Sequence, residues 1–483
     1  MKPFVNGSRG LGGIAVFGRP KSVAPQAPAH REVRTVPAYP EQLSWVGIGI
    51  ALVGVVLAVH GNHVRDHGQL AEGLALAVVG RGLALGRPPV VRHLLLGVGL
   101  LVLAWLTDSR GDHAAAQLML VGAALAALWA PPSPPSTADQ RRRIVDLVNR
   151  TADDCLAPFA QRLDKSYIFS DDGQAAIAYR VRLGVAVASG DPVGPAQSQR
   201  AAAEAYLATA NANGWRVGVL GAGETWASFW REQQGLRAVP IGRDVVIDPE
   251  TFTLTGRAFR NLRQAVQRTH NFGVTTEIYD ETELPPQLRA TLLNLVENSK
   301  RNPHRGFSMI LDGLLEEQHV GTKIVVAFDA DRRVVGFQRF ATADRGREIS
   351  QDLPWRVPGA PNGVDERIAF DMIEWAKAHG ARRVSLCFAA FPELFEAKPE
   401  RGLDRVGYWA AHRLDPMIRL ESLYRYLRKF HALGEQRYVM LRLRDVLPVA
   451  VAMLTLEFGA SRTRRRERRG WRRLARRADS AAS

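Results

Sequence analysis

The chain of 483 residues contains only two cysteines, Cys155 and Cys387. Two cysteines are too few for a disulfide framework, and their separation lacks the paired spacing of a zinc site. Scarce cysteine also agrees with a cytoplasmic body rather than an oxidising compartment. The sequence therefore predicts neither a disulfide scaffold nor a bound metal.

Several motifs of nucleotide and hydrolase chemistry are also missing. No GxGxxG joins a predicted strand to a helix, and the chain has no GxxxxGK[ST], HExxH or GxSxG. These absences disfavour a Rossmann domain, and we expect no bound cofactor.

Long apolar stretches, by contrast, crowd the first third of the chain. They run approximately over 42–60, 69–85, 90–107 and 114–130. A hydrocarbon core of ~30 Å needs about 20 apolar residues per spanning helix. The stretches therefore predict a small transmembrane bundle of about four helices at 42–131. The second stretch is the weakest because Arg81 interrupts it, and an interfacial or re-entrant segment is the alternative there.

Basic residues are distributed unevenly around these stretches. The Gly/Pro-rich segment 1–41, expected to be a disordered leader, holds six Lys and Arg, and Arg141–Arg143 follow the last stretch. The positive-inside rule then places both termini and the large body on the cytoplasmic side of the membrane.

The formal net charge is +16, and the tail 460–483 supplies much of it. Ten arginines stand there against Glu467 and Asp479. Such a tail suits anionic lipid head groups or RNA phosphates, or is a solvated segment without a specific partner.

The body at 152–459, after a linker at 132–151, shows an α/β pattern in which one order occurs twice. That order is three strands, a Gly/Pro turn, a helix and a strand. The first copy covers strands at 167–169, 175–181 and 185–188, a helix at 196–211 and a strand at 215–220. The second covers strands at 323–328, 334–341 and 347–353, a helix at 364–379 and a strand at 383–388. Two copies of one unit predict a tandem N-acetyltransferase-like fold.

Two segments of the body have residue types suited to anion or turn chemistry. Gly190–Gly194 lies between a strand and a helix, where Asp191 could bond nearby amides in a functional loop or in an ordinary turn. Arg257, Arg260 and Arg263 share a face of a predicted helix, which suits phosphate binding or simply a solvated surface.

Two further segments combine charge with aromatic or strand-end positions. Asp352, Arg356 and Glu366 are expected near the start of one helix, where they could bind an ammonium group and a phosphate, or form a strand-end salt bridge. Aromatic and cationic residues interleave over 423–438, which suits lipid-phosphate contact or an ordinary amphipathic helix.

Five strings in this order resemble the C-terminal catalytic domain of phosphatidylglycerol lysyltransferases, also called lysylphosphatidylglycerol synthases or multiple peptide resistance factors. The strings are Gly190–Gly194, Gly256–Arg263, Gly306–Ser308, Ala360–Val364 and Leu427–Tyr438. The resemblance implies a multi-pass enzyme of the bacterial cytoplasmic membrane. Such an enzyme moves an aminoacyl group from aminoacyl-tRNA to a hydroxyl of phosphatidylglycerol or a similar anionic lipid. Two alternatives are an acyltransferase with another lipid-linked acceptor and a catalytically lapsed lipid-binding or scaffold protein.

The resemblance also implies roles for individual residues. Asp352 would hold an amine of the amino acid, and Arg356 and Lys429 would meet tRNA or lipid phosphates. Asn362 and Glu366 would shape the pocket. The other implied substrate-binding residues are Asp191, Arg257, Arg260, Arg263 and Arg437. The chain departs from the family where Asp-Leu-Met-Arg is usual, since it reads Asp352-Leu353-Pro354-Trp355-Arg356. Four apolar stretches are also too few to contain the lipid flippase of larger relatives.

Overall fold

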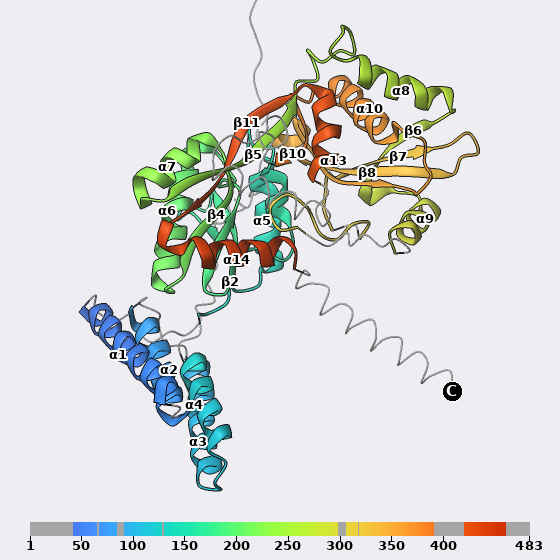
Figure 1. Ribbon diagram of the computed structural model, residues 1–483. Helices are drawn as coiled ribbons and strands as arrows, with labels where there is room; N and C mark the ends of the chain where they lie inside the picture. Colours follow the sequence, from blue (N-terminus) through green and yellow to red (C-terminus); the bar gives the residue numbers. More distant parts are fainter. Residues whose placement is uncertain are drawn as a thin grey trace, which may run out of the picture. The chain divides into compact units, whose positions relative to one another are not determined.

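The computed structural model describes residues 42–64, 67–84, 91–127, 130–297, 306–316, 318–390 and 420–459 (Figure 1). The expected leader at 1–41 and the arginine-rich tail at 460–483 lie outside these ranges. The expectations for both segments therefore stay predictions.

Four helices form where the apolar stretches predict them. They are α1 (Gln42–Val64), α2 (His67–Ala84), α3 (Val91–Asp108) and α4 (His113–Ala127). The first two pack closely because Gly54 and Gly73 lack side chains: a Cβ on either would lie 2.3 Å from a backbone nitrogen of the opposite helix. Within the described residues, no helix has both the length and the apolar character needed to cross a membrane. The four helices are thus confirmed, but their expected spanning of a bilayer is not.

The linker lies along the first strands rather than apart from them. Trp215 Nε1 donates to the Pro131 carbonyl at 2.8 Å, and the Val181 amide donates to Ser133 Oγ at 3.2 Å. The following helix, α5 (Ala138–Val148), begins with a capping box between Thr137 and Gln140. The linker is therefore fixed to the body by side-chain hydrogen bonds.

The body is built on one mixed sheet of 11 strands in the order β1-β2-β3-β4-β11-β5-β10-β9-β8-β7-β6. The strands are β1 (Ser166–Phe169), β2 (Ala176–Arg182), β3 (Val185–Ser189), β4 (Arg216–Ala222), β5 (Arg237–Ile247), β6 (Thr275–Asp280), β7 (Lys323–Phe328), β8 (Val334–Ala343), β9 (Glu348–Arg356), β10 (Arg383–Ala390) and β11 (Leu433–Leu441). The helices are α6 (Ala196–Ala212), α7 (Glu224–Gln234), α8 (Arg260–Asn271), α9 (Pro286–Glu297), α10 (Val364–Ala378), α13 (Leu420–Leu427) and α14 (Val446–Glu457). Short 3-10 turns are η1 (Ala157–Gln161), η2 (Glu281–Glu283), η3 (Asp344–Gly346), η4 (Arg428–Phe430) and η5 (Leu443–Asp445).

The predicted repeat is confirmed. Strands β1, β2 and β3 run antiparallel, α6 follows, and β4 returns parallel to β3. Strands β7, β8 and β9, helix α10 and strand β10 repeat this order. The two halves also exchange strands, because the C-terminal β11 lies between β4 and β5 of the first half, and β5 pairs with β10 of the second half.

Helices cover both faces of the sheet, so most strands are apolar on both sides. In the first half, Tyr206 of α6 and Trp230 of α7 pack on one face, and Val449 and Met453 of α14 pack on the other (Figure 1). In the second half, α8, α10 and α13 share a core cluster, and α9 contributes to a separate cluster with Phe337. The charged side chains that lie inside this apolar body must consequently be paired.

Candidate active site

The second repeat contains an opening between two parallel strands. The ladder between β9 and β10 joins only Glu348–Ser350 to Arg383–Ser385, although both strands continue beyond it. Along its other edge β10 pairs with β5 from Val384 to Ala390, so only the edge that faces β9 loses its ladder after Ser385. The two strands therefore diverge at a point where α/β sheets commonly admit a ligand.

Arg437 lies on β11 at the centre of the sheet and is 2% exposed. It stands opposite Gly242 of β5, and the register shifts directly after it, a bulge of the kind that re-aims side chains. Its guanidinium contacts three carboxylates. Nε lies 2.6 Å from Asp244, Nη1 3.2 Å from Asp191 and Nη2 2.9 Å from Asp154. We call these four residues the Asp–Arg cluster.

The members of the Asp–Arg cluster come from distant parts of the sequence. Asp244 is on β5, Asp191 follows β3, and Asp154 lies in the segment before η1. Burial disfavours the charge of Arg437, but Asp154 and Asp244 together raise its pKa well above the ordinary value. The guanidinium therefore stays charged and holds three chain segments together.

Asp191 also meets the start of a helix. The Gly223 amide, at the N-terminus of α7, donates to both oxygens of Asp191 at 3.2 and 3.1 Å. Burial and the negative charge of Asp154 raise the pKa of the Asp191 carboxyl to about 7, against the opposing effect of Arg437. Near neutral pH this carboxyl is thus poised between its charged and neutral forms.

Cys155 connects the Asp–Arg cluster to the second repeat. Its thiol donates to Asp244 Oδ2 at 3.1 Å, and its carbonyl accepts from Ser350 Oγ of β9 at 2.6 Å. Burial and the nearby Asp244 raise the pKa of this thiol well above its ordinary value. Cys155 is consequently a neutral hydrogen-bond donor rather than a nucleophile.

We expect Gly223→Ala to disturb the Asp–Arg cluster, because an added Cβ would lie 2.9 Å from Asp191 Oδ2 and 3.2 Å from Arg437 Nη1. The neighbouring groups would have to move, which should lower the free energy of unfolding by about 1–3 kcal/mol. Thermal unfolding of the purified protein in detergent would measure this. The matched control is Gly99→Ala in α3, where nothing lies within 4 Å of the added atom. An equal effect of both changes would contradict the steric argument.

A second group of predicted residues gathers at the start of α10. The carboxylate of Glu366, in its first turn, accepts a hydrogen bond from Lys429 Nζ. Arg356 Nη1 lies 3.9 Å from Asp365 Oδ2, and Asn362 is exposed in the turn that precedes the helix. The structure therefore brings together Arg356, Glu366 and Lys429 around one helix terminus, with two half-exposed cations among them.

Asp352 is held apart from that group, in a wholly buried ion-pair network. Its oxygens accept from Leu311 N at 2.8 Å and from Arg339 Nε at 2.5 Å. Arg339 Nη1 also lies 3.2 Å from Glu281. Burial raises the pKa of Asp352, and Arg339 opposes this effect. With both oxygens bonded inside the protein, the geometry favours a structural role for Asp352 over direct contact with a substrate amine.

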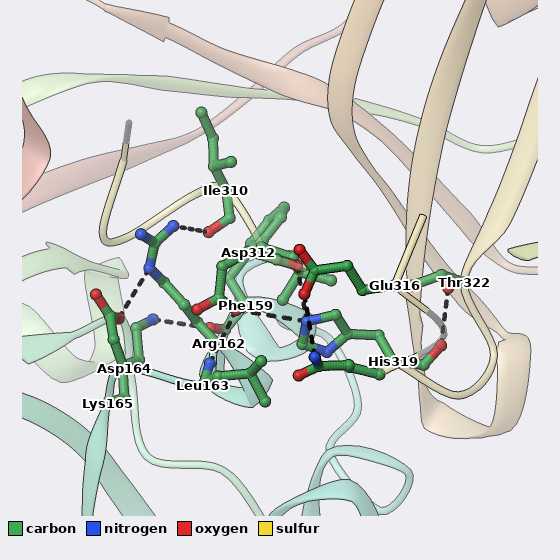
Figure 2. A network of polar contacts seen from close by, with 12 residues as sticks. Phe159, Arg162, Leu163, Asp164, Lys165, Ile310, Asp312, Glu316, His319 and Thr322 are labelled. Atoms are coloured by element: carbon green, nitrogen blue, oxygen red, sulfur yellow. Dashed lines mark hydrogen bonds and ion pairs between the residues drawn. The ribbon is translucent and has the colours of Figure 1, made fainter. Parts of the chain in front are cut away.

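A further polar network ties the segment 159–165 to the loop 306–322, and Figure 2 shows how its side chains face one another. Arg162 contacts Asp164 at 2.9 Å and the Ile310 carbonyl at 2.9 Å. The Leu163 amide donates to Asp312 Oδ1 at 2.9 Å. Buried Lys165 donates to the Phe159 carbonyl and to Ser189 Oγ, both at 2.7 Å. These bonds fix the loop that supplies Leu311 N to Asp352.

Lys165 makes the stability of the protein depend on pH. Burial and then the positive charge of Arg162 lower its pKa from 10.5 to about 7. Between pH 7 and 10 the unfolded chain therefore binds one proton more than the folded chain, and stability rises with pH. We expect the free energy of unfolding to rise by up to about 1.4 kcal/mol per pH unit in this range.

Denaturant unfolding at several pH values would measure the rise. Lys165→Met should flatten it, whereas Lys323→Met, which removes a partly exposed pair with Asp280, should leave it in place. A rise that persists without Lys165 would refute the assignment.

The basic helix predicted from Gly256 begins only at Arg260, as α8, so Arg260 and Arg263 lie on it and Arg257 lies in the turn before it. Arg257, Arg260 and Arg263 are exposed, and Arg263 Nη1 donates to the Gly256 carbonyl at 3.2 Å. None of the three bonds to the Asp–Arg cluster or to the group at α10 in the described structure. They form a separate cationic surface.

Comparison with known proteins identifies the family. The family described as "Phosphatidylglycerol lysyltransferase, C-terminal" matches residues 145–441, which hold every strand of the sheet and the whole Asp–Arg cluster. The chain belongs to this family. It is accordingly an aminoacyltransferase by family, as the resemblance implies.

Relatives in sequence support the assignment to the phosphatidylglycerol lysyltransferase family. The MprF-like domain protein Rv1619 of Mycobacterium tuberculosis is 47% identical over 396 residues, 80% of each chain. The lysylphosphatidylglycerol biosynthesis bifunctional protein LysX of Mycolicibacterium vanbaalenii is 35% identical over 289 residues, which cover 59% of this chain and 26% of that protein. The chain therefore spans only about a quarter of the bifunctional relative.

Two solved structures share the fold. One is a C-terminal domain (DUF2156) described as belonging to a lysylphosphatidylglycerol synthetase of Agrobacterium fabrum, with a TM-score of 0.58 and 22% identity over 68% of this chain and 99% of that one. The other is L-PGS from Bacillus licheniformis, with a TM-score of 0.55 and 20% identity over 68% and 98%. The predicted α/β fold of the body is confirmed by these matches.

The sequence analysis of this lysyltransferase-family chain missed Asp154 and Asp244 while naming Asp191 and Arg437. Asp244 had a detectable signal, because a carboxylate inside the apolar run of β5 requires a partner when the strand is buried. Arg339 in β8 carries the same signal. Asp154 carries none, since it stands in an irregular polar segment.

Proposed function

We propose that the protein transfers an aminoacyl group from aminoacyl-tRNA to a glycerol hydroxyl of phosphatidylglycerol at a membrane surface. The observation that carries this proposal is the family match over the entire 11-stranded sheet. Relatives such as LysX are named for lysylphosphatidylglycerol biosynthesis. We take phosphatidylglycerol as the acceptor lipid from that name. An aminoacyl ester on tRNA is the activated donor that such a transfer requires.

The reaction needs positioning more than covalent catalysis. The lipid hydroxyl attacks the ester carbonyl, a tetrahedral oxyanion forms, and the departing ribose oxygen takes up a proton. Holding the two reactants in line and stabilising the oxyanion with main-chain amides account for most of such a rate increase. The divergence of β9 from β10 after Ser350 offers main-chain groups at a suitable opening.

The cations of the site suit the phosphates of both substrates. Arg356 and Lys429 remain half-exposed at the start of α10, where the helix terminus also favours anions. Glu366 bonds to Lys429, and Asn362 lies exposed in the turn before α10, where both would contact the substrate. Arg257, Arg260 and Arg263 on the α8 surface would contact tRNA phosphates, and this attraction should weaken steeply with salt.

The four N-terminal helices are suited to contact with lipid. Large apolar side chains point outward from them, among them Val56 (66% exposed), Leu95 (67%), Trp105 (70%) and Leu118 (76%). Exposed apolar surface on this scale marks a membrane or protein contact. A hollow of about 510 Å³ between α2, α3 and α4, lined by Leu76, Val98 and Leu101 among others, could accept an acyl chain. These helices would keep the body beside its lipid substrate, with the body on the cytoplasmic side where tRNA is present.

Transfer can be measured with the purified full-length protein in phosphatidylglycerol vesicles supplied with radiolabelled lysyl-tRNA or alanyl-tRNA. We expect a labelled, ninhydrin-positive lipid that disappears when the tRNA is first digested with ribonuclease. Phosphatidylcholine vesicles, which lack the glycerol hydroxyls, serve as the control. Labelling of a different lipid-linked acceptor would reassign the substrate, and vesicle binding without any labelled lipid would refute the proposed activity.

A further inference from the structure

Two oxygens of the Asp–Arg cluster have no hydrogen-bond partner. Asp154 Oδ2 and Asp244 Oδ1 are buried atoms with no hydrogen-bond partner among the described residues. The two residues are 8% and 2% exposed. Buried polar atoms are nearly always bonded, so unbonded ones indicate a place for water or a ligand. The other oxygens of these carboxylates are already used, Asp154 Oδ1 by Leu156 N and Arg437, and Asp244 Oδ2 by Cys155 and Arg437.

The charge of the cluster is also incomplete. Three carboxylates face one guanidinium, so full ionisation leaves two negative charges without a cation. Burial and the charge of Asp154 raise the pKa of Asp191 to about 7, so this carboxyl keeps a proton in part of the molecules near neutral pH. A bound cation would replace that proton and satisfy the unbonded oxygens at once.

The chemistry of the free acceptors favours an organic cation. No group of three or more His, Cys, Asp or Glu in the described structure is placed to hold a metal ion, and here the guanidinium of Arg437 stands between the carboxylates. A primary ammonium carries one charge and three donors, so a single nitrogen can bond to several carboxylate oxygens at once. The Asp154 and Asp191 side chains keep 11% and 10% exposure, so the cluster opens to its surroundings beside them.

We propose that the Asp–Arg cluster binds the primary ammonium of the aminoacyl group, through the free oxygens of Asp154 and Asp244 and through Asp191. The inference rests on the proposed function, because aminoacyl transfer supplies an ammonium-bearing substrate. It moves amine recognition from the fully bonded Asp352 to carboxylates with free acceptors. Arg437 holds the three carboxylates in place and prevents the cluster from closing on itself.

Binding of small amines to the full-length protein in detergent, measured by isothermal titration calorimetry, tests the proposal without tRNA or lipid. Three probes separate the two ammonium groups that an aminoacyl donor can offer. L-Lysinamide has both, L-norleucinamide has only the α-ammonium, and Nα-acetyl-lysinamide has only the side-chain ammonium. The probe that binds like lysinamide identifies the group that the cluster recognises.

The decisive variant is Asp244→Asn, which keeps the shape and removes one charge. We expect lysinamide binding to weaken by about 10- to 100-fold, the effect of losing one charge-assisted hydrogen bond. Asp445→Asn is the matched control, because Asp445 is a buried carboxyl that pairs with Arg216 away from the cluster, and its loss should leave binding unchanged. Asp154→Asn, at the more exposed edge, replaces Asp244→Asn if that variant does not fold.

Proton release gives an independent readout that a purely structural role would not produce. Titrations in two buffers of different ionisation enthalpy should show that lysinamide displaces a proton near pH 7, and Asp191→Asn should abolish the displacement. The groups that face Asp191 are Asp154, Asp244, Arg437 and the Gly223 amide, so affinity should rise between pH 6 and 8 as Asp191 ionises.

Each outcome decides a separate question. Unchanged lysinamide binding in a folded Asp244→Asn or Asp154→Asn protein, or stabilisation by potassium ions without amine binding, would overturn the ammonium subsite. Lipid transfer by the wild type with no amine binding would overturn the subsite and leave the proposed function standing. Amine binding that depends on Asp244, with no lipid transfer, would support the subsite and overturn the function.

Discussion

Replacing Arg339 with methionine is expected to lower the free energy of unfolding by about 3–5 kcal/mol. The guanidinium and both of its carboxylate partners, Asp352 and Glu281, are at most 1% exposed. Removing the cation leaves two negative charges in an apolar interior without compensation. Denaturant unfolding of the purified protein would measure the loss.

The control for this change is Arg332→Met, which removes an exposed pair with Glu277. Exposed pairs contribute little, so this variant should unfold like the wild type. Adding Asp352→Asn and Glu281→Gln to Arg339→Met should recover part of the lost stability. If Arg339→Met unfolds like the control, Asp352 is not held as described and its proposed structural role is wrong.

Arg437→Met should slow lipid aminoacylation about a hundredfold and also destabilise the protein by about 3–5 kcal/mol. Three carboxylates would then face one another without a cation. Their repulsion would be relieved either by protonation of a carboxylate or by movement of the side chains apart. A displacement of about 1 Å in a positioning site costs about a hundredfold in rate. The rate of labelled lipid formation in phosphatidylglycerol vesicles and the thermal unfolding temperature would measure the two effects.

Arg243→Met is the matched control on the adjacent strand, because Arg243 is half-buried and bonds to the Gly434 carbonyl. It should retain most of the activity. Arg437→Lys should remain impaired, since an ammonium cannot reach three carboxylates with the fixed fork of a guanidinium. Full activity of Arg437→Lys would show that charge alone, and not the fork, organises the cluster.

Much of the fold could be predicted from the sequence, because local patterns indicate the strands and helices of both repeats. Runs such as Lys323–Phe328 alternate with helices and with turns rich in Gly and Pro, and these are short-range signals. The exchange of β5 and β11 could not be predicted in this way. Which strands become neighbours is decided by long-range packing of nearly uniform apolar faces.

The site shows the same division. The turn at Gly190–Gly194 and the start of α10 could be predicted as polar positions beside strand ends, and their residues do gather there. The partnership of Asp191 with Arg437 spans 246 residues and depends on the strand exchange. Asp352 shows what a resemblance leaves open, because it marks a residue as important without saying whether the residue faces a substrate or, as the structure has it, an arginine.

The place of β11 in the sheet has a consequence for biosynthesis. Arg437 is synthesised after about nine tenths of the chain, whereas Asp154, Asp191 and Asp244 are synthesised much earlier. Until β11 is synthesised, the first half therefore has an unpaired sheet edge at β4 and β5 and three carboxylates without their arginine partner. A premature stop before β11 would leave a product without this central strand, and such a chain should be degraded rather than accumulate.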